Sequence, residues 1–320
     1  MKTITVRVVS TETAAAGIRL LTLAAVDGSA LPAWTPGSHV DLHLGPNCIR
    51  QYSLCGPLDD PALYQVAVKL EPQSRGGSKF VHESLEAGSV LAISTPRNHF
   101  PMAADAGHSL LLAGGIGITP MISMARALHA QGAAFELAYF SRSVDHAAFR
   151  PELAAGSLRH AARFFDGLQR EAVVQALEEL LSIRPEHGHL YLCGPQPFME
   201  TVRGVASRHG WPEDAVHLEY FAASEPVDQG AQTSFDVRLA RSGMTLTVPA
   251  DRTIVDVLRE QGVEIETSCE QGVCGTCVTA VLEGTPEHHD SFLSSRERAQ
   301  GDCMAVCISR CKSKLLVLDL

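Results

Sequence analysis

Four cysteines near the C-terminus constrain this chain more than any other feature. Cys269, Cys274 and Cys277 follow one another closely, and Cys307 comes after 29 intervening residues. The resulting pattern, C-x4-C-x2-C followed by a distant cysteine, is that of plant-type [2Fe–2S] sites. Since such a cluster accepts one electron at a time, the pattern predicts a protein that transfers electrons.

The competing interpretation of these cysteines is a structural zinc site or a set of buried thiols. Zinc ribbons usually pair two C-x2-C knuckles, whereas only one such pair occurs here, preceded by a further cysteine. Gly272 and Gly275 lie between the predicted ligands and allow the tight turns that a cluster loop needs. For the fourth ligand, Cys303 and Cys311 compete with Cys307, which gives the plant-type spacing.

Composition and charge limit the remaining possibilities. The formal net charge of -10 disfavours nucleic acid as a partner, because phosphate binding needs clustered Lys and Arg. Lys2, Arg7 and Arg19 interrupt the region where a signal peptide needs an apolar core, and no apolar stretch reaches the roughly 20 residues of a membrane helix. Without a secretion signal, the cysteines are expected to be metal ligands or buried thiols rather than disulfides. We expect a cytoplasmic protein with neither nucleic acid nor membrane as a partner.

The sequence pattern divides the chain into three domains and a linker. Residues 1–102 carry short alternating segments separated by Gly, Pro and Asp turns, which is typical of antiparallel strands in a barrel or sandwich. Over 103–225, apolar runs alternate with helical patterns, which predicts a doubly wound parallel α/β sheet. Residues 226–233 are small and polar and are expected to be a linker, and 234–320 form the domain with the four cysteines.

Two turns of the predicted α/β domain suit a nucleotide. Gly114 to Pro120 (GGIGITP) lies where a strand meets a helix, so that backbone N–H groups and the helix dipole can hold a pyrophosphate. Cys193-Gly194-Pro195 also ends a strand and opens a helix, which predicts the Cys193 thiol beside a nicotinamide. The alternatives are a plain turn and a buried strand cysteine. Ser141 and Arg142 end the second strand, where the ribose 2′ position is read, and Arg142 also suits the 2′-phosphate of NADPH.

The first domain contains two further candidates for a ligand site. Arg50-Gln51-Tyr52-Ser53 combines a cation for a phosphate, an aromatic ring for a flat heterocycle and a hydroxyl for its edge. Gly76-Gly77-Ser78 precedes a helical stretch and offers a second phosphate cradle. Each motif alone also fits an ordinary strand or turn. The histidine cluster at His288-His289-Asp290 is predicted to be an exposed loop.

In this order, the motifs RQYSL, GGS, GGIGITP, CGPQPFM and C-x4-C-x2-C-x29-C resemble the phthalate dioxygenase reductase family over nearly all 320 residues. Members of this family are single-chain reductases of two-component Rieske oxygenases. The resemblance implies FMN in an antiparallel β-barrel, NADH on the doubly wound sheet and the [2Fe–2S] cluster in a C-terminal β-grasp ferredoxin domain. It also implies a terminal Rieske oxygenase as the partner, and it favours NADH over NADPH.

The resemblance assigns roles to particular residues. The flavin is expected to contact Arg50, Gln51, Tyr52, Ser53, Val68, Lys69, Gly76, Gly77, Ser78 and, over its face, Phe221, for which Tyr220 is the alternative. The nucleotide is expected to contact Gly114, Gly115, Gly117, Thr119, Pro120, Ser141, Arg142, Cys193, Gly194 and Pro195. The cluster ligands are expected to be Cys269, Cys274, Cys277 and Cys307.

The expected reaction needs no general base. NADH gives up two electrons together as hydride whereas the cluster accepts one, so a flavin stands between them. Catalysis is then mostly positioning, and Ser53 near the flavin edge and Cys193 near the nicotinamide are the expected catalytic residues. Two other functions stay open: a reductase of the same build that serves another acceptor, such as a haem monooxygenase, and a non-enzymatic iron-sulfur electron carrier.

Overall fold

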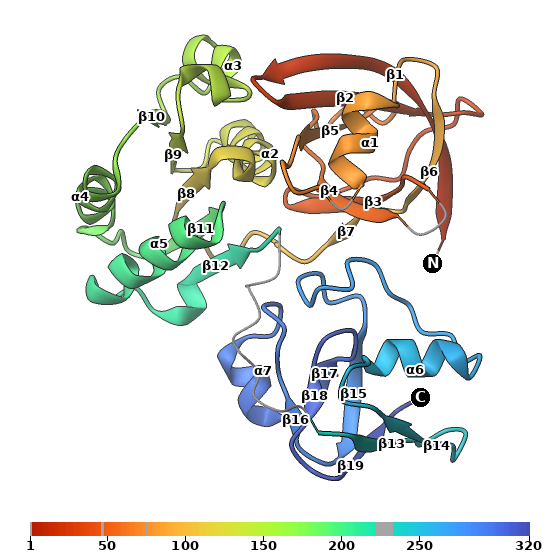
Figure 1. Cartoon of the computed structure of the whole chain (residues 1–320). Helices are drawn as coiled ribbons and strands as arrows, with labels where there is room; N and C mark the ends of the chain where they lie inside the picture. Colours follow the sequence, from red (N-terminus) through yellow and green to blue (C-terminus); the bar gives the residue numbers. More distant parts are fainter. Residues whose placement is uncertain (1, 46–47, 75, 222–232) are drawn as a thin grey trace. The chain divides into compact units, whose positions relative to one another are not determined.

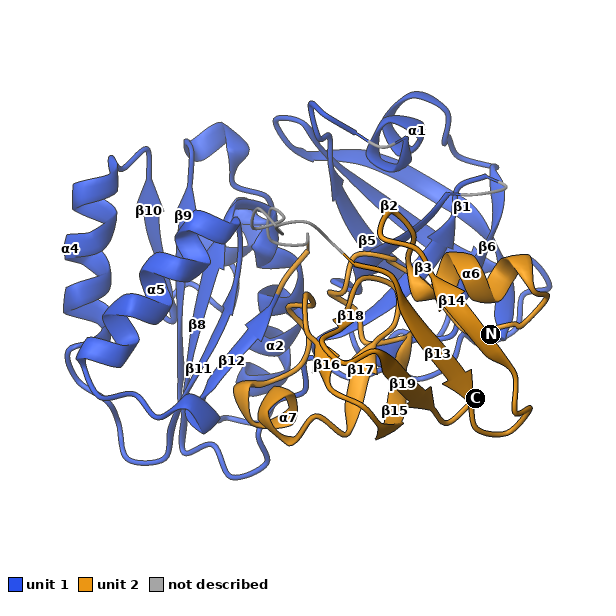
Figure 2. Cartoon of the chain, turned by 60° about the horizontal axis from the view of Figure 1, so that its bottom comes forward, with its two compact units in different colours: residues 1–219 blue, residues 220–320 orange. Residues whose placement is uncertain are grey.

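The computed structural model describes residues 2–45, 48–74, 76–221 and 233–320. The chain forms two compact units, Met1–Glu219 (unit 1) and Tyr220–Leu320 (unit 2), which Figure 2 colours separately. The barrel and the α/β sheet therefore belong to one unit, and the cysteine-bearing domain is the other. Of the predicted linker 226–233, all residues but Thr233 lie outside the described residues.

An antiparallel barrel forms the first half of unit 1 (Figure 1). Its strands are β1 (Thr3–Ala15), β2 (Ile18–Ala25), β3 (Ser38–His43), β4 (Ile49–Ser53), β5 (Tyr64–Lys69), β6 (Val90–Ser94) and the short β7 (Arg97–Asn98). They pair in the order β4-β3-β6-β1-β2-β5, and an antiparallel bridge between Leu54 and Val66 joins the two ends. Helix α1 (Gly77–Glu83) packs against β5. The predicted antiparallel barrel is confirmed.

A five-stranded parallel sheet forms the second half of unit 1. Its strands are β8 (His108–Gly114), β9 (Phe135–Ser141), β10 (Ala162–Asp166), β11 (Gly188–Cys193) and β12 (Val216–Glu219). The order β10-β9-β8-β11-β12 reverses direction between β8 and β11, so the predicted doubly wound sheet is confirmed. The helices are α2 (Ile118–Ala130), α3 (Arg150–Ala155), α4 (Arg170–Leu181) and α5 (Gln196–Arg208), with 3-10 turns η1 (Gly115–Gly117), η2 (Val144–His146) and η3 (Glu213–Ala215).

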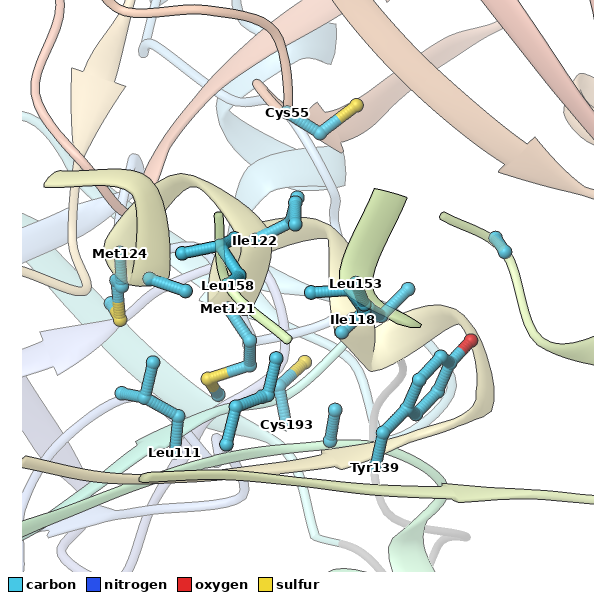
Figure 3. Close-up of a cluster of buried hydrophobic side chains, with 14 of the residues drawn as sticks. Cys55, Leu111, Ile118, Met121, Ile122, Met124, Tyr139, Leu153, Leu158 and Cys193 are labelled. Carbon is cyan, nitrogen blue, oxygen red and sulfur yellow. The ribbon is translucent and has the colours of Figure 1, made fainter. Parts of the chain in front are cut away.

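Helix α2 joins the barrel to the sheet through one shared core. Figure 3 shows Cys55 of the barrel on one side of the helix, and Leu111 and Cys193 of the sheet on the other. Met121 and Ile122 of α2 are fully buried between them. Since burying each such side chain contributes about 1.5–3 kcal/mol, this core holds the two halves of unit 1 in a fixed relation.

Unit 2 is a small mixed sheet with two short helices beside it. Its strands are β13 (Phe235–Leu239), β14 (Thr245–Val248), β15 (Val278–Glu283), β16 (Pro286–Glu287), β17 (Cys303–Ala305), β18 (Arg310–Cys311) and β19 (Leu315–Leu318), and its helices are α6 (Ile254–Glu260) and α7 (Ser295–Gln300). The main sheet has the order β14-β13-β19-β15-β17. Thr253 and Asp256 form a capping box that begins α6, whose buried face joins the core of the sheet. The expected ferredoxin-like domain is confirmed.

Candidate active site

The two glycine-containing turns of the sheet lie against each other at its carboxyl edge. A Cβ on Gly117 would lie 2.1 Å from the carbonyl oxygen of Cys193, so only glycine allows this approach. Gly114 and Gly194 both pack against the ring of Phe198, at 2.8 and 2.9 Å from a hypothetical Cβ. The two predicted nucleotide turns therefore meet at the point where the strand order reverses, which is where such sheets bind ligands.

Other residues of the first turn hold it in shape. Gly115 has a φ of 55°, which glycine adopts without strain. The Thr119 hydroxyl donates to the Ile116 carbonyl at 3.0 Å, and Thr119 and Pro120 are buried. Pro195 lies just before α5, where its missing N–H is no loss. Thr119 thus supports the turn, and its contact with the nucleotide stays a prediction.

Ser53 of the barrel meets the sheet at a residue that the sequence did not single out. Its hydroxyl lies 3.5 Å from Oε2 of Glu219, the last residue of β12. Glu219 is in turn the parallel-strand neighbour of Cys193. Both expected catalytic residues therefore lie beside one carboxyl group. A lone glutamate in the sequence carries no signal of this arrangement, because its partners come from β4 and β11.

Ser53, Glu219 and Cys193 form a junction between the barrel and the sheet, and loss of solvation leaves this junction nearly uncharged. Loss of solvation raises the pKa of the Glu219 carboxyl from its ordinary 4.5 to about 8, and the hydrogen bond from Ser53 offsets only part of the rise. Burial also raises the pKa of the Cys193 thiol, and the neighbouring Glu219 raises it further. At neutral pH the carboxyl is mostly protonated and the thiol is neutral.

The expected flavin residues cluster on one side of the barrel. Gly77, at the start of α1, lies against Arg50: a Cβ there would come within 2.5 Å of Arg50 Cγ. Gly76 has a φ of 94°. Burial raises the pKa of the Tyr52 hydroxyl, which therefore stays a phenol. A cation over a glycine turn, with a neutral aromatic ring two residues along β4, suits a phosphate-bearing flavin.

The remaining expected flavin residues have protein partners of their own. Gln51 Nε2 lies 3.3 Å from His39 Nε2, and Lys69 pairs with Glu71 at 2.8 Å. The Val68 side chain is buried in the barrel core. Ser78 Oγ donates to Ser74 Oγ and accepts from the Glu71 N–H. Phe221 belongs to unit 2 and is exposed, so its place over the flavin stays a prediction.

The four expected cluster ligands come together in unit 2 as two pairs. The Cys269 thiol interacts with the Cys274 thiol, and the Cys277 thiol interacts with the Cys307 thiol. Cys307 also interacts electrostatically with Cys269, and Cys277 with Cys274. In the described part of the chain, no three His, Cys, Asp or Glu side chains are arranged around a single ion. Two adjoining thiol pairs fit two irons.

Glycines shape the loop that carries these thiols. Gly272 and Gly275 have φ values of 70° and 72°. A Cβ on Gly275 would lie 2.3 Å from the ring of Phe292, and one on Gly272 would lie 2.6 Å from Ile308. The Gln271 N–H donates to the Cys269 sulfur at 3.3 Å. This loop therefore provides both the close approach and the N–H donors that a sulfur-rich cluster requires.

The two competing cysteines have other surroundings. Cys311 Sγ lies 3.0 Å from Ser313 Oγ and contacts the carbonyl of Thr285, and Cys303 interacts with Asp302. Neither shows the sulfur-to-sulfur contacts of the four expected ligands among the described residues. The structure therefore favours Cys307 as the fourth ligand.

The prediction that His288-His289-Asp290 is an exposed loop is wrong. The Asp290 side chain is fully buried and that of His288 is 9% exposed. Asp290 accepts from the Leu293 N–H at 2.7 Å and from Ser309 Oγ at 3.3 Å, and it packs against Gly272 of the cysteine loop. The polarity of these three residues predicted an exposed loop. In the structure, Asp290 instead supports the loop that carries the thiols.

Known proteins resemble the whole chain. The family described as oxidoreductase NAD-binding domain matches residues 111–204, and the 2Fe-2S iron-sulfur cluster binding domain matches residues 237–312. Vanillate O-demethylase oxidoreductase of Pseudomonas sp. (strain HR199 / DSM 7063) is 46% identical over 297 residues, which cover 92% of each chain. The solved structure of phthalate dioxygenase reductase is 36% identical with a TM-score of 0.74, and covers 99% of this chain and 98% of that chain.

A longer protein also contains this arrangement. An intact type IV self-sufficient cytochrome P450 monooxygenase is 37% identical with a TM-score of 0.89, and the match covers 99% of this chain and 41% of that chain. No helix among the described residues has the length and apolarity to cross a membrane.

Proposed function

Because this chain belongs to the family of the vanillate O-demethylase oxidoreductases and phthalate dioxygenase reductase, we propose that it is the reductase component of a two-component Rieske-type aromatic oxygenase or demethylase. It is an oxidoreductase with NADH, FMN and a [2Fe–2S] cluster as its cofactors. Electrons pass from NADH to the cluster and on to the oxygenase component.

The contact of Ser53 with Glu219 is the observation that carries this proposal. It joins the strand with the flavin motif to the edge of the nucleotide sheet, within one compact unit that also brings Cys193 next to Glu219. Such a junction is what hydride transfer between two flat rings requires, since the reacting atoms must be held about 3–3.5 Å apart. The two thiol pairs of unit 2 then supply the one-electron acceptor.

The side chains at this junction position the two cofactors and take no covalent part in the reaction. When bound, FMN supplies the conversion of a two-electron hydride into the single electrons that a [2Fe–2S] cluster accepts. The Ser53 hydroxyl offers a hydrogen bond at the flavin edge, and Glu219 holds a proton on its carboxyl near neutral pH. The fully buried Cys193 side chain would keep water from the nicotinamide side when the nucleotide is bound. A nearly uncharged junction favours transfer of hydride over its loss to solvent.

The experiment that tests the proposal follows the visible spectrum. Anaerobic addition of NADH to the purified holoprotein should bleach the flavin and then the cluster, and the released flavin should have the mass of FMN. A spectrum that does not bleach would refute an NADH-dependent reductase and leave a simple electron carrier. Electron delivery is then measured with the oxygenase component of a vanillate O-demethylase as acceptor.

A second acceptor is favoured by one observation. The chain matches 41% of the length of a self-sufficient cytochrome P450 monooxygenase with a TM-score of 0.89. A haem monooxygenase is therefore the alternative partner. Faster reduction of a separate cytochrome P450 domain than of a Rieske component, followed as its ferrous carbon monoxide complex, would favour this alternative.

A further inference from the structure

The ends of β9 and β10 bring a carboxylate to the edge where the ribose 2′ position is expected. The two strands are parallel, with Asp166 in register with Ser141. Ser141 Oγ donates to Asp166 Oδ1 at 2.6 Å, and the N–H of Gly167 donates to the Ser141 carbonyl at 2.9 Å. Asp166 was not among the expected site residues, because it lies on the third strand and not on the second.

The same carboxylate holds a cation. Arg150 Nη1 lies 2.5 Å from Asp166 Oδ2, and the two side chains are 25% and 18% exposed. The Arg150 guanidinium also lies over the ring of Phe164, 4.1 Å from its centroid. Since the pair is largely covered, solvent screens it less than an ion pair on the surface. Arg150 is therefore fixed, and its charge is balanced by Asp166.

A second arginine at this edge differs from Arg150. Arg142 follows β9 and is exposed, and no carboxylate in the described part of the chain pairs with it. A 2′-phosphate needs arginines whose donors are available. A 2′-hydroxyl needs an acceptor such as a carboxylate. Among the described residues, this edge thus contains an acceptor (Asp166), an engaged arginine (Arg150) and an exposed arginine (Arg142) that water screens.

We propose that Asp166 selects NADH over NADPH, by accepting a hydrogen bond from the ribose 2′-hydroxyl and by keeping Arg150 from a 2′-phosphate. This inference rests on the proposed function and names the residue that sets its nucleotide specificity. A 2′-phosphate brings close to two negative charges beside the Asp166 carboxylate. It also competes with Asp166 for Arg150, and the exposed Arg142 offsets this only weakly because of screening.

The first test changes the charge and keeps the shape. In Asp166→Asn, the ratio of kcat/KM for NADPH to that for NADH, with ferricyanide as acceptor, should rise at least tenfold. Arg150→Gln should change the ratio in the opposite direction, at least threefold, since Asp166 is then unbalanced. The matched control is Glu136→Gln, which breaks a pair between the same two strands, with Arg163 at 3.1 Å, near their amino ends. This control should leave the ratio unchanged.

The second test measures binding without electron transfer. Calorimetry with 2′,5′-ADP and 5′-AMP should show at least tenfold tighter binding of 2′,5′-ADP to Asp166→Asn than to the unmodified holoprotein, with no such gain for 5′-AMP. An equal effect on both probes, or an unchanged kcat/KM ratio in both variants, would overturn the role of Asp166 while the proposed reductase stands. Failure of NADH itself to reduce the unmodified protein would instead remove the proposed function and this inference with it.

Discussion

The most direct prediction concerns the proton on Glu219. Its pKa in the folded protein is about 8, above its ordinary 4.5, so between these values the unfolded chain loses a proton that the folded chain keeps. Each pH unit in this window lowers the free energy of unfolding by about 1.4 kcal/mol. Between pH 5.5 and 7.5, the unmodified protein should therefore lose about 2.5 kcal/mol relative to Glu219→Gln, whose side chain does not ionise.

Urea unfolding of the holoprotein, followed by tryptophan fluorescence, measures this difference in unit 1, which contains Glu219. Both tryptophans, Trp34 and Trp211, lie in unit 1, so their fluorescence reports on the unit that contains Glu219. Glu213→Gln is the matched control, since Glu213 is an exposed carboxyl in η3, just before the same strand. A stability difference between the unmodified protein and Glu219→Gln that is the same at both pH values would refute a Glu219 carboxyl that stays protonated at neutral pH.

Three further predictions test the other parts of the site. Cys307→Ser should remove the visible absorbance of the cluster whereas Cys303→Ser should keep it, and the opposite result would reassign the fourth ligand. Gly117→Ala should destabilise unit 1 by several kcal/mol in urea unfolding, because its Cβ would overlap the Cys193 carbonyl, whereas Gly204→Ala in the open middle of α5 should stabilise it by about 0.5–1 kcal/mol. Cys193→Ala should slow flavin reduction by NADH about tenfold in stopped flow without releasing FMN, and an unchanged rate would end its catalytic role.

The elements of the fold were largely predictable because their signals are local. The alternation of β1 and β3 and the strand-to-helix pattern from β8 to α2 lie within short windows of sequence. Such short windows do not predict the packing of α2. This helix is buried on both sides by residues that are distant in the sequence, such as Cys55 and Leu153. The sequence suggested a helix of the second domain, and the structure shows that the same helix holds the barrel.

The residues of the candidate site were likewise predictable only where their signal is local in the sequence. Gly117 and Cys193 were recognisable because each stands in a glycine-containing turn after a strand. Glu219 and Asp166 were not, since each ends a strand with no motif of its own and gains its partners by strand pairing and by contact across unit 1. His288-His289-Asp290 was misjudged for a related reason: polarity predicts exposure, but a buried carboxylate with enough hydrogen-bond donors is stable.

The amino-acid sequence by itself determined that this chain transfers electrons, because a cluster needs four thiols and a nucleotide turn needs glycines, and both are matters of residue type and spacing along the chain. Only the tertiary structure decided where the charges of the site lie. Whether Glu219 keeps its proton, and whether Arg150 is engaged, depends on what surrounds them in space. Solvation and ion pairing act over a few ångströms between residues that are far apart in the sequence.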